Sequence, residues 1–270
     1  MKNIVLFDMD GTLTPARKPM GHDMFDALSL LAQYADIGIV SGSPFEYIRE
    51  QCSQIFENCN ELWLNDVVVM PCNGTQKYIW ENGRWEKVFS LDMRQEIGEE
   101  VYGLLMRELI LEQHVCSMHH EDMGFSLAGH FISYRDSMVN WSPIGRAATH
   151  ADRDKFVKAD QIFKIRDLTV EKLNKNPILT SKLNIALGGH TSVDIYPIGW
   201  DKTYALNHYD SFDNIWFIGD KCLNAHGNDK PLYETINQTY PGHARQTSGP
   251  SETIELIKEI INSIEVSREG

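Results

Sequence analysis

The sequence predicts an α/β fold with a parallel sheet, interrupted by a smaller segment of mixed strands and helices. The chain opens with an apolar run, residues 4–7, that ends in two carboxylates, Asp8 and Asp10. Such an unbroken run is typical of a strand buried on both faces. A second run, residues 215–218, also leads into an acid, Asp220. Between the two runs the pattern changes to short alternating strands and helices, which indicates an inserted α+β domain.

Composition limits the classes of partner. The 270 residues carry 38 acidic and 25 basic side chains, a net charge of −13. This excess argues against a nucleic acid or an anionic membrane surface as the main partner. The first apolar run is too short for a signal peptide, and no run approaches the length of a membrane span. Five scattered cysteines suit reduced thiols. We therefore expect a cytoplasmic protein whose main partner is neither a nucleic acid nor a membrane.

The turn after the first strand is the first candidate site. Alternate side chains of a strand share a face, so Asp8 and Asp10 can point the same way. Two close carboxylates repel unless a cation lies between them, and Mg²⁺ favours carboxylate oxygens. A carboxylate in such a site can attack phosphorus and form an aspartyl-phosphate. An ordinary acidic turn explains this stretch equally well on its own. Arg17, just downstream, is either a phosphate ligand or a solvated surface residue.

The second strand, residues 37–40, leads into Ser41 and Gly42. A serine hydroxyl and an unhindered backbone N–H at this point can meet phosphoryl oxygens. We expect Ser43 to cap the helix that follows, whose free N–H groups suit a phosphate. A plain strand-to-helix turn is the alternative.

The inserted domain begins at a hairpin that is expected to turn at Asn82-Gly83. A long helix is expected over residues 91–113, and strands over residues 124–127 and 130–134. We place the boundaries near residues 82 and 195. The core domain then comprises residues 1–81 and 196–270, and the inserted domain comprises residues 82–195.

Four polar residues of the inserted domain form a plausible sugar-phosphate set: Arg135, Arg146, Ser192 and Asp194. Arginine suits a phosphate, and the hydroxyl and carboxylate suit sugar hydroxyls. Surface charge is the alternative explanation for both arginines.

The chain then returns to the core. Lys202 opens a helix after Trp200 and Asp201, and the strand that ends in Asp220 precedes a loop with Asn228 and Asp229. Carboxyl ends of parallel strands meet at one edge of a sheet, where α/β proteins bind ligands. We therefore expect Asp220 to lie near Asp8.

In order, spacing and residue type, these pieces resemble the haloacid dehalogenase (HAD) phosphotransferase superfamily. Nearly the whole chain resembles the eukaryotic-type phosphomannomutases within it. The pieces that carry the resemblance are residues 8–17, 140–146, 188–194, 199–202, 219–221 and 227–229. The most specific are Ser142-Pro143-Ile144-Gly145-Arg146 and Gly199-Trp200-Asp201-Lys202.

The resemblance implies a doubly wound HAD-like core with an inserted C2b-type cap. It implies Asp8 as the nucleophile and Asp10 as the general acid/base, with the Asp10 carbonyl among the Mg²⁺ ligands. Asp220 would complete the protein's metal ligands, supported by Asn228 and Asp229. Ser41 and Lys202 would hold phosphoryl oxygens. The residues that would bind the non-reacting end of the substrate are Arg17, Arg135, Arg146, Ser192 and Asp194.

The family moves phosphate between C1 and C6 of mannose through a hexose 1,6-bisphosphate, and forms homodimers through the cap. One departure is Ala128, where the family usually has an arginine; another is Cys72, where it usually has an acid. A sugar-phosphate phosphatase on the same scaffold is therefore the alternative. A non-catalytic sugar-phosphate-binding protein is a third hypothesis, which the intact set Asp8, Asp10, Lys202 and Asp220 disfavours.

Overall fold

A computed structural model describes residues 2–57, 62–225 and 227–269. The chain divides into two compact units, Met1–Ser90 with Gly199–Gly270, and Leu91–Ile198. The first unit is the core and the second is the cap. The first boundary lies beyond the expected residue 82, because both strands of the hairpin remain in the core sheet.

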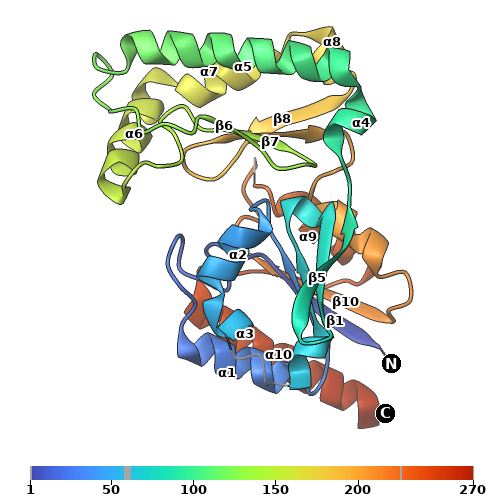
Figure 1. The fold of residues 1–270 in the computed structure, drawn as a ribbon. Helices are drawn as coiled ribbons and strands as arrows, with labels where there is room; N and C mark the ends of the chain where they lie inside the picture. Colours follow the sequence, from blue (N-terminus) through green and yellow to red (C-terminus); the bar gives the residue numbers. More distant parts are fainter. Residues whose placement is uncertain (1, 58–61, 226, 270) are drawn as a thin grey trace. The chain divides into compact units, whose positions relative to one another are not determined.

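The core is a seven-stranded sheet in the order β11-β10-β1-β2-β3-β4-β5 (Figure 1). The first five in this order are parallel, and β4 and β5 are antiparallel. The strands are β1 (Asn3–Phe7), β2 (Asp36–Val40), β3 (Val67–Met70), β4 (Gln76–Glu81), β5 (Arg84–Ser90), β10 (Asn214–Gly219) and β11 (Ala244–Gln246). The chain leaves β1 toward β2 on one side and returns to β10 on the other. The expected α/β fold with a parallel core sheet is therefore confirmed. The point at which the strand order changes direction lies between β1 and β10, and α/β sheets bind ligands at the carboxyl ends of the strands at such a point.

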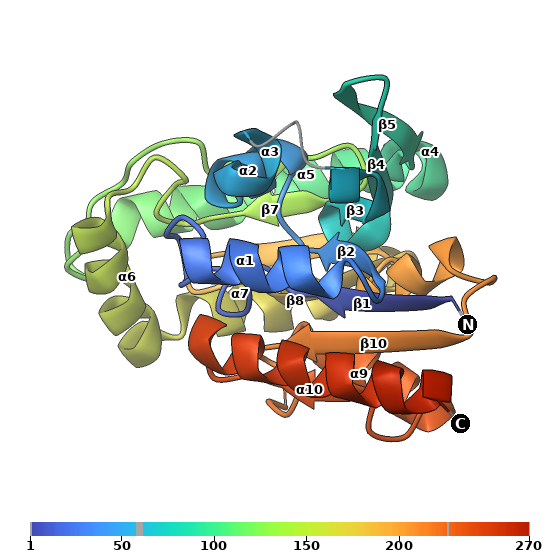
Figure 2. The ribbon, with the colours of Figure 1, turned by 90° about the horizontal axis from the view of Figure 1, so that it is seen from below.

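Helices cover both faces of this sheet because its central strands are apolar on both faces. All five residues of β1 are buried. Val5 and Phe7 pack in the cluster that includes α1 (His22–Leu31) and α10 (Pro250–Glu269), which lie side by side (Figures 1 and 2). Ile4 and Leu6 pack on the other face with residues of α9 (Lys230–Thr239). The short helices α2 (Phe45–Gln51), α3 (Ser53–Glu57), η1 (Leu62–Asp66), η2 (Cys72–Gly74) and η3 (Lys202–His208) fill the connections.

Two local predictions concern turns. The hairpin does turn at Asn82 and Gly83, both with positive φ (53° and 78°), as the Asn-Gly signal requires. The expected N-cap at Ser43 is wrong. α2 begins one residue later, with Pro44 in the cap position, and the Ser43 N–H donates to the Ser41 hydroxyl instead.

The cap contains a four-stranded antiparallel sheet in the order β6-β7-β9-β8. Its strands are β6 (Ile132–Tyr134), β7 (Val139–Trp141), β8 (Leu183–Leu187) and β9 (Val193–Pro197). Its helices are α4 (Met93–Ile97), α5 (Glu99–His119), α6 (His150–Phe163), α7 (Ile165–Asn174) and α8 (Pro177–Thr180). The helix expected over residues 91–113 is two helices, because Gly98 at φ 84° breaks it. Residues 124–127 form no strand. Among the described helices, none has the length and apolar character to cross a bilayer.

Candidate active site

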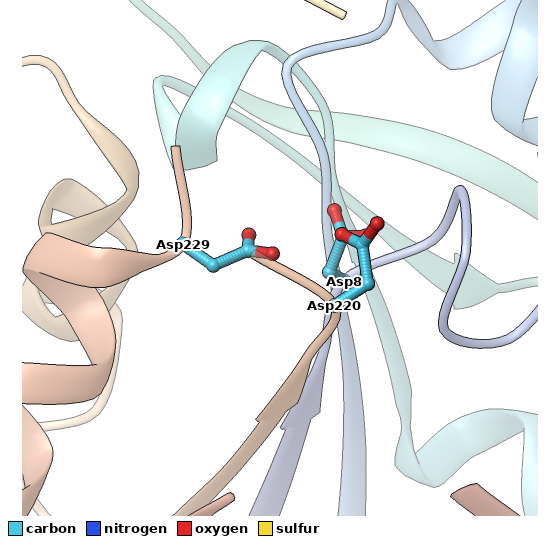
Figure 3. A group of neighbouring side chains, drawn as sticks. All are labelled: Asp8, Asp220 and Asp229. Atoms are coloured by element: carbon cyan, nitrogen blue, oxygen red, sulfur yellow. The ribbon is translucent and has the colours of Figure 1, made fainter. Parts of the chain in front are cut away.

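Three carboxylates from separate elements meet at the carboxyl edge of the core sheet. Asp8 follows β1, Asp220 follows β10, and Asp229 directly precedes α9. One oxygen from each lies within 4.8 Å of the others (Figure 3). β1 and β10 are paired in register from Asn3 to Phe7, and the Asp8 N–H donates to the Ile218 carbonyl at 2.9 Å. The pairing of the two strands therefore brings Asp8 and Asp220 together, as expected.

Lys202 lies within this cluster. Its ammonium forms ion pairs with both Asp8 and Asp229, and the side chain is 1% exposed. The lysine begins η3, where the Asp201 carboxylate accepts hydrogen bonds from the N–H and hydroxyl of Thr203 at 2.8 and 2.6 Å. That cap fixes the start of the turn and so the direction in which Lys202 leaves the backbone.

The carboxylates outnumber the cations that face them. Burial, and then the charge of Asp229, raise the pKa of Asp8 to about 7, against the opposing effect of Lys202. Burial raises the pKa of Asp220 to about 6, whereas the Lys202 charge lowers that of Asp229. The half-exposed Lys221 ammonium lies 4.0 Å from Asp220. Three carboxylates and two ammonium groups leave an excess negative charge, which a divalent cation held by carboxylate oxygens would neutralise.

The turn at Gly11 leaves room for Asp220. Gly11 has φ 91°, and a Cβ on it would lie 2.6 Å from Asp220 Oδ2. Glycine is therefore required for two reasons, the backbone conformation and the close approach of the carboxylate.

Asp10 lies outside the three-carboxylate group. Its Oδ1 accepts hydrogen bonds from the Arg17 N–H at 3.0 Å and from the Tyr47 hydroxyl at 3.3 Å. Arg17 thus contacts the site through its backbone, and its side chain is half-buried. The Thr12 hydroxyl donates to Asp8 Oδ2 at 3.4 Å. Sequence reasoning missed Tyr47 and Thr12. Thr12 lies within the first motif, but nothing in the sequence links Tyr47 to Asp10.

Ser41 directly follows β2, the strand next to β1, and is 4% exposed. Its carbonyl accepts a hydrogen bond from the Asn73 N–H at 2.9 Å, and the Asn73 side-chain amide donates to the Trp200 carbonyl at 3.3 Å. Asn73, held at φ 65°, therefore joins the turn that contains Ser41 and Gly42 to the loop that presents Lys202. Sequence reasoning missed this role of Asn73.

The remaining metal candidate, Asn228, is exposed in the turn before Asp229. In the cap, Arg146 donates to the Asn140 side chain at 3.0 Å, and Asn140 donates to Asp194 at 2.6 Å. A Cβ on Gly188 would lie within 3 Å of both Ser192 and Asp194, so these two side chains are also close. The cap therefore gathers three of its four candidate residues.

Arg135, the fourth candidate, lies in the β6–β7 turn, where its N–H donates to the Met138 carbonyl. Sequence reasoning missed Arg153, a buried residue of α6. Its guanidinium donates to the Arg146 and Ala148 carbonyls and to the Thr191 hydroxyl, and so holds the segments that present Arg146 and Ser192.

Fold and site define a class of protein, the HAD-like α/β proteins that carry acidic residues at the carboxyl edge of the sheet. Similar solved structures include the C-terminal domain of Candida albicans trehalose-6-phosphate phosphatase (TM-score 0.61, 14% identity, 97% of this chain and 93% of that one). N-terminally truncated Plasmodium falciparum IMP-nucleotidase is also similar (TM-score 0.59, 16% identity, 96% and 70%). At these identities the likeness concerns the fold alone.

The chain belongs to the eukaryotic phosphomannomutase family, whose model matches residues 24–263. A phosphomannomutase of Schizosaccharomyces pombe is 34% identical over 264 residues, 97% of this chain and 95% of that protein. One of Arabidopsis thaliana is 31% identical over 262 residues, 96% and 97%. The chain is therefore a member of a family of enzymes.

Proposed function

We propose that the chain interconverts mannose 6-phosphate and mannose 1-phosphate through a phosphorylated Asp8 and a hexose 1,6-bisphosphate. The observation that carries the proposal is the cluster of Asp8, Asp220, Asp229 and Lys202, of which all but Asp220 are buried, in a chain whose curated relatives are named phosphomannomutases. This cluster has the parts that phosphoryl transfer requires, namely a nucleophile and fixed groups that neutralise phosphoryl oxygens.

Asp8, Asp220 and Asp229 would hold Mg²⁺, and the family resemblance adds the Asp10 carbonyl and Asn228. When bound, the ion supplies positive charge that keeps the carboxylates ionised and neutralises phosphoryl oxygens. Lys202, whose ammonium contacts Asp8, binds a phosphoryl oxygen, and the Ser41 hydroxyl and the Gly42 backbone N–H bind others.

Asp8 carries the phosphoryl group, and Asp10 transfers the proton. Phosphorylated Asp8 passes its phosphoryl group to the free hydroxyl of the sugar monophosphate, and Asp10 takes the hydroxyl proton. The bisphosphate then turns end for end. Asp8 attacks the other phosphorus, and Asp10 returns the proton to the sugar oxygen that leaves. The Tyr47 hydroxyl and the Arg17 N–H hold the Asp10 carboxylate in place for both steps.

The set that binds the non-reacting end comprises Arg17, Arg135, Arg146, Ser192 and Asp194. The arginines pair with the distal phosphate, and the Ser192 hydroxyl and Asp194 carboxylate bind sugar hydroxyls. Because Asp194 is linked to Arg146 through Asn140, the phosphate and hydroxyl contacts are fixed relative to one another.

We also propose a homodimer through the cap. The C-terminal half of α5 exposes four large apolar side chains: Ile110, Leu111, Val115 and Met118. Apolar area of this kind is characteristic of homodimer interfaces. We place the enzyme in the cytoplasm, because the four described cysteines are free thiols.

Ala128 supports a second candidate, a sugar-phosphate phosphatase. Its N–H donates to the Ile144 carbonyl at 2.8 Å, beside the segment that contains Arg146. The absence of an arginine here removes one charged hydrogen bond to a distal phosphate, about 1.5–3 kcal/mol. A mutase depends on binding of the distal phosphate, whereas a phosphatase does not.

Phosphorus NMR of the products tests the two candidates. The protein is incubated with mannose 1-phosphate, Mg²⁺ and a trace of glucose 1,6-bisphosphate. A mutase yields mannose 6-phosphate, and the rate depends on the bisphosphate. Release of inorganic phosphate without the 6-phosphate would establish the phosphatase, and no conversion at all would contradict both.

A further inference from the structure

Arg166 contacts the β8–β9 loop of the cap, residues 188–192, which contains Ser192 and leads directly to Asp194. The residue lies in the first turn of α7, and its side chain is 13% exposed. Its Nη1 donates hydrogen bonds to the carbonyls of Gly189 and Ser192, at 3.0 and 3.2 Å. One guanidinium nitrogen therefore holds the loop near both of its ends.

Asp160, on α6, fixes the direction of this guanidinium. One of its carboxylate oxygens accepts a hydrogen bond from the Arg166 N–H at 2.9 Å, and the other accepts one from Arg166 Nε at 2.8 Å. The contact forms where the chain turns from α6 into α7 at Lys164, which has φ 55°. The Asp160 side chain is 8% exposed, so solvent screens this charged pair little. The guanidinium is thus held in one orientation, with Nη1 directed at the loop.

The loop needs such support because of its own composition. It begins with Gly188 and Gly189, and glycine loses more conformational freedom on folding than any other residue. The Gly188 N–H donates to the Ser192 carbonyl at 2.9 Å, so this carbonyl accepts hydrogen bonds from both Gly188 and Arg166. These two bonds fix the peptide group that leads into β9, and with it the residues on either side.

We propose that Arg166, oriented by Asp160, is a positioning residue for sugar recognition. The inference rests on the proposed function, in which the Ser192 hydroxyl and the Asp194 carboxylate bind sugar hydroxyls. Arg166 acts through the loop: both groups meet the sugar already in place, which reduces the entropy lost on binding. The hydroxyls bound there do not react, so these contacts stabilise the ground state and the transition state alike. Loss of the positioning residue therefore raises KM and leaves kcat unchanged.

Two measurements on the full chain test this role. Hydrogen exchange without substrate, followed by mass spectrometry, reports the mobility of residues 188–192. Steady-state kinetics with mannose 1-phosphate, Mg²⁺ and a trace of glucose 1,6-bisphosphate give KM and kcat. The variants are Arg166→Gln and Arg166→Lys. Lys172→Gln is the matched control, because Lys172 lies on the same helix but forms its ion pair with Glu112 of α5.

We expect Arg166→Gln to exchange at least about tenfold faster in the loop, because local opening becomes easier. Its KM should rise at least about tenfold, with kcat changed by less than about twofold. Arg166→Lys keeps a positive charge beside Asp160 but lacks the planar fork of donors, so it should recover only part of the KM. Lys172→Gln should match the parent in both measurements.

The role of Arg166 is overturned if Arg166→Gln matches the parent in either measurement, or if Lys172→Gln has the same effects. It is also overturned if kcat and the thermal midpoint fall while KM stays the same, which is the result expected of a purely structural arginine. If Arg166→Gln does not fold, Arg166→Lys decides by the same criteria. A parent chain that does not convert mannose 1-phosphate overturns the proposed function, and this inference with it. A parent that converts the sugar while the variant keeps its KM overturns this inference alone.

Discussion

The ammonium of Lys202 lies between the carboxylates of Asp8 and Asp229, in a position with 1% side-chain exposure. Asp8 and Lys202 are 194 positions apart in the chain, on either side of the inserted cap. One buried cation is thus shared by the proposed nucleophile and a candidate metal ligand. The cluster forms only when both segments of the core have folded together, and its parts can be tested separately.

Asp8→Asn removes the nucleophile with almost no change in shape. We expect mutase turnover to fall below detection, while the thermal midpoint stays the same or rises, because one of three mutually repelling carboxylates is gone. The coupled product assay and a thermal melt measure the two effects. Asp10→Asn is the matched control: it keeps the nucleophile but lacks the group that moves the proton in both steps, so turnover should fall by about 10²- to 10⁴-fold and remain detectable. A fully active Asp8→Asn protein would rule out the aspartyl-phosphate route.

Lys202→Met keeps the length of the side chain and removes its charge. Two buried carboxylates then lose their shared partner, and we expect the free energy of unfolding in EDTA to drop by about 3–5 kcal/mol. Mg²⁺ should restore part of this loss, because it replaces the missing positive charge. Urea unfolding with and without Mg²⁺ measures both. Lys221→Met, at a half-exposed lysine near the same acids, should change stability by less than about 1 kcal/mol. Equal effects at the two lysines would contradict the assigned role of Lys202.

Gly11→Ala tests whether the turn leaves space for Asp220. The new Cβ would lie 2.6 Å from Asp220 Oδ2, and the residue would have to keep φ at 91°. We expect a loss of about 1–2 kcal/mol in stability from the backbone alone, together with weaker Mg²⁺ binding as Asp220 is displaced. The control is Gly21→Ala, where no atom lies within 4 Å of the new Cβ and φ is −76°. Calorimetry with Mg²⁺ compares them, and unchanged affinity in Gly11→Ala would refute the steric argument.

The sequence predicts those parts of the candidate site that depend on local sequence pattern and on the order of the strands. Asp8 and Asp220 were expected to meet because each follows an apolar run that pairs in a parallel sheet, and the structure brings them together. Contacts that depend on how a helix lies over the sheet were not predictable. The Tyr47 hydroxyl reaches Asp10 only because α2 packs beside the first turn, and no spacing in the sequence encodes that contact.

The same limit applies in the cap and at the helix ends. Gly98 breaks the helix expected over residues 91–113. Glycine can adopt a positive φ, but its presence in the sequence does not predict that it will. Ser43 had the features of an N-cap, yet its N–H bonds to Ser41 and the helix starts after Pro44. Arg153 was indistinguishable from a surface arginine, because its buried partners are mostly backbone carbonyls, which any sequence has.

The affinity for Mg²⁺ should rise with pH. In the metal-free chain the pKa of Asp8 is about 7 and that of Asp220 about 6, both above 3.8, so protons compete with the ion. We expect affinity to increase from about pH 5 to about pH 8, with proton release on binding, because the acids must ionise first. Calorimetry in buffers of different ionisation enthalpy counts these protons. Asp8→Asn should flatten the upper part of the profile.

Stability without metal should change in the opposite direction. A carboxyl with a pKa raised by folding binds more protons in the native than in the unfolded chain. The metal-free protein is therefore expected to lose stability as the pH rises from about 4 to about 7, and Mg²⁺ to stabilise it most near neutral pH. Thermal melts across this range measure both trends. If the affinity for Mg²⁺ did not change with pH, Asp8 and Asp220 would already be ionised in the metal-free protein.

Arg146→Gln tests whether the cap binds the non-reacting phosphate of the substrate through Arg146. The change removes a charge that would pair with the non-reacting phosphate, although glutamine still donates a hydrogen bond. We expect kcat/KM for mannose 1-phosphate to fall about 10- to 100-fold, the scale of a charged hydrogen bond. The share of product that appears as free phosphate should rise, because a bisphosphate that is held less firmly leaves phosphorylated Asp8 open to water. Arg107→Gln, at an exposed position on α5, is the control and should leave both quantities unchanged. If Arg146→Gln kept the product ratio of the parent, the cap arginines would not distinguish a mutase from a phosphatase, and the distal phosphate would have to be bound elsewhere.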